Sequence, residues 1–95
     1  MPRGAPRLRT VDGKLNQIAP RVRERRTALK LTQDALCARL ADVTGGDWVA
    51  DRRDIFRIED GRRSVHDLEI LALAKALECT PLWLLTGEEP ITALS

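Results

Sequence analysis

The chain has 95 residues, of which 43% are hydrophobic and 32% are charged, so it can form one small globular domain with a modest core. Its sequence has no run of 18 apolar residues that could span a membrane, and one histidine with two cysteines is too small a set for a four-ligand zinc site. Three aromatic residues are fewer than a stacking surface for single-stranded nucleic acid usually needs.

The net charge of +2 is unevenly distributed along the chain. Residues 1–30 contain nine Lys or Arg residues and two acidic residues, whereas residues 67–95 contain one Lys and five acidic residues. A basic half suggests that a polyanion binds on one side. Cys37 and Cys79 lie in apolar surroundings without CxxC spacing, which favours buried, reduced thiols in a cytoplasmic protein over a disulfide.

Residues 1–13 contain two prolines, two glycines and three arginines without apolar periodicity. This composition predicts a flexible basic arm, which either contacts phosphates or is a solvated tail. We expect residues 14–87 to form the folded domain and residues 88–95 to form a C-terminal tail.

The first helix is predicted over residues 19–29, where an apolar stripe also contains a charged residue. Arg26 follows Val22 by four positions, and Glu59 follows Ile55 by four positions in the third helix. A charge on an apolar stripe needs a partner. We therefore predict that Arg26 and Glu59 pair with each other; the alternative is that Arg26 extends to solvent.

The second helix is predicted over residues 33–43, with Thr32 as its N-cap and with Leu36 and Leu40 on its buried side. The chain then returns through Gly45 and the residues after it to the third helix.

The third helix is predicted over residues 51–60, with Asp51 as a cap and Gly61 as its terminator. Ile55 and Ile58 mark a buried stripe. Three arginines fall mostly on the opposite face: Arg52, Arg53 and Arg57. This arrangement suits insertion into a DNA major groove, but it also describes an ordinary surface helix with solvated arginines.

The fourth helix is predicted over residues 67–78, with Leu73 and Leu77 in its core stripe. Thr80 and Pro81 open a single-turn helix that runs through Leu85. No strand pattern or internal repeat is evident in the sequence. The expected fold is therefore all-α, with five short helices.

Four separated segments resemble the phage-repressor and Cro-type helix-turn-helix family: LTQDALCARL (31–40), IFRIEDGRR (55–63), LAKAL (73–77) and LWLLTG (82–87). The resemblance covers about residues 18–87. It implies a compact, five-helix, lambda-repressor-like domain that binds double-stranded DNA. The family has an Arg–Glu pair between its first and third helices, and Arg26 with Glu59 matches that pair.

The resemblance also implies which residues meet DNA. Gln33 would contact a phosphate, and the positions that read bases would be Arg52, Arg53 and Arg57. The turn after the third helix could lie against the DNA backbone through Arg62, Arg63 and Ser64. Phe56 could contact a thymine methyl group or pack inward. Asp54 could accept from a cytosine amino group, orient Arg57 or repel phosphate.

The sequence departs from the family in the connection between its second and third helices. From Leu40 to Ile55 this connection is roughly two helical turns longer than the usual turn of ~3–4 residues. We expect the second helix to extend and the chain to return through a glycine pair, which leaves open the angle at which the third helix meets DNA.

The functional expectation is a sequence-specific DNA-binding transcriptional regulator of the repressor type, with no cofactor and no metal. The alternative is a protein-interaction module or an antitoxin-type protein that binds a partner such as a toxin. We do not expect an enzyme, because no catalytic partner is evident for His66, the single histidine. A homodimer is expected through an apolar patch of Leu71, Leu82 and Trp83, unless Trp83 closes the domain's own core.

Overall fold

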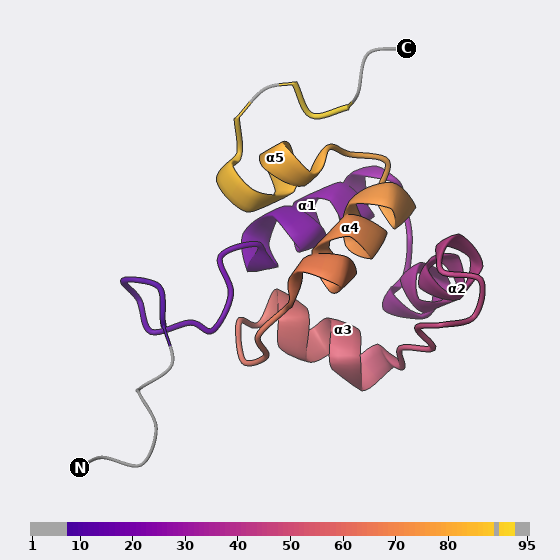
Figure 1. Cartoon of the computed structure of the whole chain (residues 1–95), viewed down its shortest axis with the longest axis horizontal. Helices are drawn as coiled ribbons and strands as arrows, with labels where there is room; N and C mark the ends of the chain where they lie inside the picture. The colour runs from indigo at the N-terminus through magenta and orange to yellow at the C-terminus, as the bar shows by residue number, and fades with distance from the viewer. Residues whose placement is uncertain (1–7, 89, 93–95) are drawn as a thin grey trace.

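This computed structural model describes residues 8–88 and 90–92 (Figure 1). Residues 1–7 of the predicted basic arm (1–13) are outside the described residues. So are residues 89 and 93–95 of the predicted tail. Residues 10–14 form a closed turn, in which the Thr10 amide donates to the Lys14 carbonyl over 2.8 Å and the Gly13 amide donates to the Thr10 carbonyl over 2.9 Å.

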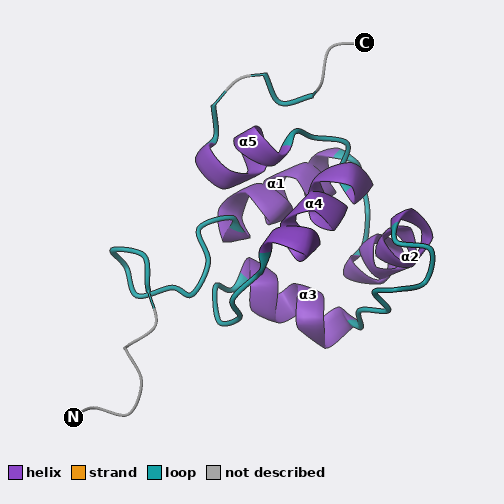
Figure 2. Cartoon of the chain, viewed as in Figure 1, coloured by secondary structure: helices purple, strands orange, loops and turns teal. Residues whose placement is uncertain are grey.

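Five helices make up the domain, and Figure 2 shows no strand in the part of the chain that is described. They are α1 (Ala19–Ala28), α2 (Gln33–Val43), α3 (Arg52–Glu59), α4 (Asp67–Ala76) and α5 (Pro81–Thr86). The predicted five-helix, all-α fold is therefore confirmed. Among the described residues, none of the helices has the length and apolar character that crossing a bilayer requires.

The observed helix ends differ from the predicted ones by at most two residues. Asp51 and Asp60 cap α3 rather than belong to it. α4 ends two residues before the predicted position, because Leu77 is its C-cap and Glu78 has a left-handed backbone with φ of 56°. The connection between α2 and α3 comprises residues 44–51 and is long, as predicted.

Side-chain hydrogen bonds fix the starts of α2, α3 and α5. The Thr32 hydroxyl accepts from the Ala35 amide over 3.0 Å, and the Thr80 hydroxyl accepts from the Trp83 amide over 3.0 Å. α3 begins with a reciprocal capping box, in which Asp51 and Asp54 each accept from the other's backbone amide over 2.9 and 3.0 Å. These bonds satisfy amides that the first helical turn leaves unpaired.

The core lies where α4 packs on α2 and α5, and where α3 packs on α1 and α2 (Figure 1). The predicted apolar stripes converge there, and their largest fully buried side chains are Ile18, Val22, Leu36, Leu40, Ile55, Ile58, Leu73, Leu77 and Leu84. Burial of each such side chain is worth about 1.5–3 kcal/mol. α3 lies at the edge of the domain, with its outer face away from the other helices (Figure 1).

Asn16 joins the start of α1 to the end of α3. Its Oδ1 accepts from the amides of Ile18 and Ala19 over 3.1 and 2.8 Å. Its Nδ2 donates to the carbonyls of Ile58 and Arg63 over 3.0 and 2.9 Å. One amide side chain therefore caps α1 and holds the turn that follows α3.

Several basic residues bind the C-terminal ends of helices within the domain. Arg21 donates to the carbonyls of Leu84 and Leu85 over 2.7 and 2.8 Å. Arg25 donates to the Leu77 carbonyl over 2.9 Å, and Arg39 binds the Ala76 carbonyl over 3.0 Å. Helix C-termini carry partial negative charge. Part of the basic excess of the first thirty residues therefore serves the fold, and charge counting alone overstated the surface available to a polyanion.

Candidate nucleic-acid interface

The outer face of α3 carries the residues that were predicted to read bases. Arg52, Arg53 and Arg57 are exposed, while Ile55 and Ile58 are fully buried beneath them. The sequence left the orientation of Phe56 open, and the structure exposes its ring on the same outward side. The face therefore combines guanidinium groups with one aromatic ring.

Both carboxylates at the start of α3 are held locally. Asp54 accepts from the Asp51 amide within the capping box, and its other oxygen lies 4.0 Å from Nε of Arg63. Asp54 is therefore engaged with the helix start and with the turn after α3 rather than with Arg57. Arg52 lies 4.0 Å from the Asp34 carboxylate, in an exposed pair of the kind that contributes only about 0–1 kcal/mol.

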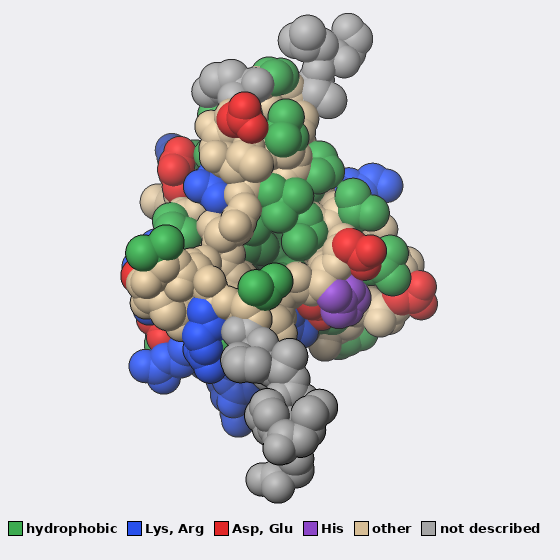
Figure 3. Space-filling model, turned by 60° about the vertical axis from the view of Figure 1, so that its left-hand side comes forward, with side chains coloured by type: hydrophobic (Ala, Val, Ile, Leu, Met, Phe, Trp, Pro, Cys, Tyr) green, Lys and Arg blue, Asp and Glu red, His purple; other side chains and the backbone are tan. Residues whose placement is uncertain are grey.

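An open hollow joins α3 to the turn that follows it. Its lining consists of Arg53, Phe56, Arg57, Arg62, Arg63 and Ser64. Lys and Arg side chains gather at the lower end of the face in Figure 3, at the level where α3 lies in Figure 1. The fold thus brings six of the predicted DNA-contact residues to one surface.

The structure brings Arg26 and Glu59 together in a two-pronged ion pair. Nε of Arg26 donates to Oε2 of Glu59 over 2.6 Å, and Nη2 donates to Oε1 over 3.0 Å. Nη1 of Arg26 also donates to the Leu31 carbonyl over 2.8 Å. The Glu59 side chain is 0% exposed. The pair therefore ties α1 to the end of α3 and to the segment before α2.

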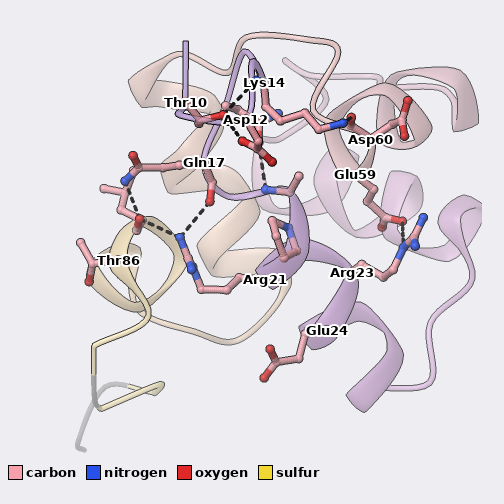
Figure 4. A pocket seen from close by; sticks show the side chains of 14 residues that line it. Thr10, Asp12, Lys14, Gln17, Arg21, Arg23, Glu24, Glu59, Asp60 and Thr86 are labelled. Atoms are coloured by element: carbon pink, nitrogen blue, oxygen red, sulfur yellow. Dashed lines mark hydrogen bonds and ion pairs between the residues drawn. The ribbon is translucent and has the colours of Figure 1, made fainter. Parts of the chain in front are cut away.

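Gln33, the predicted phosphate contact, lies beside this pair at the start of α2. Its Nε2 donates to Oε1 of Glu59 over 3.3 Å. Arg23, which the sequence analysis did not single out, lies 3.6 Å from the same oxygen and is largely exposed. Figure 4 shows Arg23 reaching Glu59 from α1, with Lys14 beside Asp60. The spacing of Arg23 three positions before Arg26 was the available signal for it.

The two arginines after α3 have different surroundings. Arg62 is 73% exposed and pairs with Asp60 over 2.5 Å, and Ser64 is also exposed. The Arg63 side chain is only 26% exposed and forms a two-pronged pair with Glu69 over 3.0 and 2.7 Å. The hydrogen bonds from Arg63 hold the pKa of Glu69 below its usual value. Arg63, which was predicted to contact phosphate, is therefore already bound by Glu69 in the first turn of α4.

The predicted dimer residues also separate into two groups. Leu71 and Leu82 are 54% and 51% exposed, whereas Trp83 is 4% exposed within the domain's own core. Trp83 is therefore removed from the candidate interface, because its ring packs inside the domain. Leu68, three positions before Leu71 on α4, is exposed and was missed. Hydrophobic side chains gather in the middle of the face shown in Figure 3.

Both cysteines are free thiols. Burial raises the pKa of Cys37 and of Cys79, so each is expected to be protonated at neutral pH. In the described part of the chain, no group of three or more His, Cys, Asp or Glu side chains is placed to hold a metal ion.

Two solved structures are similar to this one. The P22 c2 repressor protein, crystallised in complex with synthetic operator 9T in the presence of Tl+, is 30% identical with a TM-score of 0.63 over 77% of this chain and 98% of that chain. The restriction-modification controller protein C.AhdI from Aeromonas hydrophila is 37% identical with a TM-score of 0.56 over 74% of this chain and 94% of that chain. The chain belongs to the phage-repressor and Cro-type helix-turn-helix family.

In this helix-turn-helix domain, α2 and α3 form the motif and residues 44–51 replace its usual short turn of ~3–4 residues. The family membership rests on these solved structures, since no protein-family model and no curated protein matches the sequence.

Proposed function

We propose that this chain is a sequence-specific transcriptional regulator of the repressor type, and that α3 reads the major groove of double-stranded DNA. The observation that carries this proposal is the exposed arginine face of α3, which rests on two fully buried isoleucines, Ile55 and Ile58. The similar P22 c2 repressor was crystallised with an operator, which supports DNA as the ligand.

Base reading is assigned to the outer face of α3. A guanidinium group can bind O6 and N7 of guanine with two hydrogen bonds, and this role is given to Arg52, Arg53 and Arg57. Arg53 is the preferred base-reading residue over Arg52, because the carboxylate of Asp34 lies 4.0 Å from Arg52 and competes for its guanidinium group. The exposed Phe56 ring suits contact with a thymine methyl group.

Phosphate contacts are assigned to residues at the edges of α3. Gln33 lies at the start of α2, where partial positive charge favours an anion. Arg62 and Ser64 are exposed in the turn after α3.

The folded unit is taken as residues 14–87, with a basic arm before it and a tail after it. We assign the protein to the cytoplasm.

The protein is further proposed to act as a homodimer. One recognition helix reads only a few base pairs, so two copies on half-sites about one helical turn apart would give a longer operator. Leu71 and Leu82 supply exposed apolar surface for this contact, with Leu68 beside Leu71 on α4.

Selection of bound sites from random duplex DNA with the purified protein tests the function. On the selected site, Arg53→Ala or Arg57→Ala should cost about 1–3 kcal/mol and relax the preference at one or two base pairs. Arg62→Ala should weaken all duplexes alike and lower the slope of log K against log salt by about one unit.

Equal losses on selected and random DNA for all three variants would show that α3 does not read bases. A wild-type protein that prefers no duplex, and whose binding is insensitive to salt, would instead favour a protein-interaction module. In that case the exposed face around Leu68 and Leu71 is the surface on which to seek a protein partner, such as a toxin.

A further inference from the structure

We propose that Arg63 positions α3 rather than binding phosphate, and that the long connection before α3 influences DNA recognition through Arg63. This inference rests on the proposed function, because it assigns a role in DNA reading to residues outside the contact surface.

The guanidinium group of Arg63 is already occupied by the protein. Nη1 donates to Oε1 of Glu69 and to the Ser64 carbonyl, both over 3.0 Å, and Nη2 donates to Oε2 of Glu69 over 2.7 Å. Glu69 is itself 12% exposed. An arginine has five N–H donors, and most of these are directed at partners within the domain. Little of the group remains for a DNA phosphate.

Arg63 connects the start of α3 with the turn that follows the helix. Arg63 itself follows the end of the helix, while its Nε lies 4.0 Å from Asp54 in the first turn of the helix. Glu69 belongs to the first turn of α4. The Arg63 carbonyl accepts from Nδ2 of Asn16 over 2.9 Å, which adds a tether from the start of α1. Arg63 therefore links α3 to both α4 and α1 through direct contacts.

The long connection meets Arg63 through the indole of Trp48. The guanidinium carbon lies 5.8 Å from the centroid of the ring, within range of a cation–π contact. Trp48 is fastened to the end of α2, because its amide donates to Oγ1 of Thr44 over 3.0 Å, and that hydroxyl donates to the Leu40 carbonyl over 2.7 Å. A change in the conformation of the connection would therefore alter the position of the Arg63 guanidinium group.

Neighbouring Arg62 provides a matched contrast. It carries the same charge, but its side chain is 73% exposed against 26% for Arg63. Water screens an exposed ion pair such as that of Arg62 and Asp60, so a phosphate can compete for it. The Glu69 carboxylate is less exposed than that of Asp60 and accepts hydrogen bonds from both Nη1 and Nη2 of Arg63. The two adjacent arginines should therefore respond differently to the same substitution.

The test measures affinity for the selected site and for random duplex DNA at several salt concentrations. The variants are Arg63→Ala, Glu69→Gln, Trp48→Leu and Trp48→Phe, with Arg62→Ala as the control. Circular dichroism at the assay temperature and titration of the active fraction restrict the comparison to folded protein. Glu69→Gln is a mild change that keeps the test informative if Arg63→Ala does not fold, and Trp48→Phe is the conservative control for Trp48→Leu.

The positioning role predicts loss of selectivity with no change in salt dependence. Arg63→Ala and Glu69→Gln should each reduce the ratio of selected-site to random-site affinity by about tenfold, comparable to the loss of one base contact. The double variant should lose no more than Arg63→Ala alone. Trp48→Leu should act in the same direction, and Trp48→Phe should retain the wild-type ratio because a phenyl face still accepts the cation.

Two results overturn this inference alone. A fall of about one unit in the salt slope for Arg63→Ala, matching Arg62→Ala, would make Arg63 a phosphate contact. An unchanged affinity ratio in folded Arg63→Ala, Glu69→Gln and Trp48→Leu would mean that the contacts of Arg63 with Glu69 and Trp48 are purely structural. A wild-type protein without any preferred duplex would instead overturn the proposed function, and the inference with it.

Discussion

Glu59 is the buried charged residue on which the geometry of α3 depends. Its side chain has no exposed surface, and removing a carboxylate from water costs several kcal/mol unless partners replace the water. Arg26 supplies two hydrogen bonds and Gln33 supplies a longer third one. The pair is therefore weak evidence for high stability, but breaking it leaves a buried charge without compensation.

A double-mutant cycle measures this dependence. Arg26→Ala and Glu59→Ala should each lower the free energy of unfolding by about 3–5 kcal/mol, and the double variant should lose less than the sum. Urea denaturation followed by circular dichroism provides the measurement. Arg23→Ala is the control, because the exposed Arg23 lies farther from the same carboxylate and should change stability little. Strictly additive losses would show that Arg26 and Glu59 are not energetically coupled.

At the scale of the element, α3 is too short to be stable by itself. A helix of eight residues depends on its caps and on tertiary packing. The capping box fixes its start, and Gly61 closes its end with a φ of 75°. The segment before α1 then covers that end, because the Leu15 amide donates to the Gly61 carbonyl over 2.8 Å and Lys14 reaches the Asp60 carbonyl.

Substitution of Gly61 tests this closure. Gly61→Ala should destabilise the domain by about 1–2 kcal/mol through its left-handed backbone alone. A Cβ there would also lie 2.6 Å from Cδ of Lys14, so the Lys14 side chain must shift. Gly46→Ala is the matched control, since Gly46 has a φ of 89° and nothing within 4 Å of the added atom. Thermal unfolding should show the larger loss for Gly61→Ala; equal losses would mean that Lys14 yields freely.

At the scale of the whole molecule, the fold divides the basic residues between two tasks. Arg21, Arg25 and Arg39 bind carbonyls at the C-terminal ends of helices. The arginines of α3 and Arg62 remain exposed. A net charge of +2 therefore conceals a concentrated basic surface.

Assembly is also a property of the whole molecule. Leu71→Glu with Leu82→Glu should leave the fold intact, because both side chains are exposed, and should convert the proposed dimer into a monomer. Light scattering of the free protein and of its complex with the selected site provides the measurement. Val11→Glu is the control, as an exposed apolar residue outside α4 and α5. Wild-type protein that is monomeric in both conditions would contradict the dimer.

The helices, their buried stripes and the resemblance to the family were predictable from local patterns in the sequence. Apolar spacing, the caps at Thr32, Asp51 and Thr80, and the closing Gly61 are local signals, so they can be read without knowing how the helices pack. The partnership of Arg26 and Glu59 was also predictable, because each stands out as a charge on an otherwise apolar stripe.

The partners of the other long polar side chains depend on how the helices pack and were not predictable from the sequence. Arg62 and Arg63 are equivalent neighbours in the sequence, yet one extends to solvent and the other binds Glu69 and Trp48. Trp83 was likewise predicted to lie either at a dimer interface or in the domain's own core, and it is buried in the core. A long side chain binds whatever group the packed helices bring within its reach, and that group comes from distant parts of the chain that no local pattern specifies.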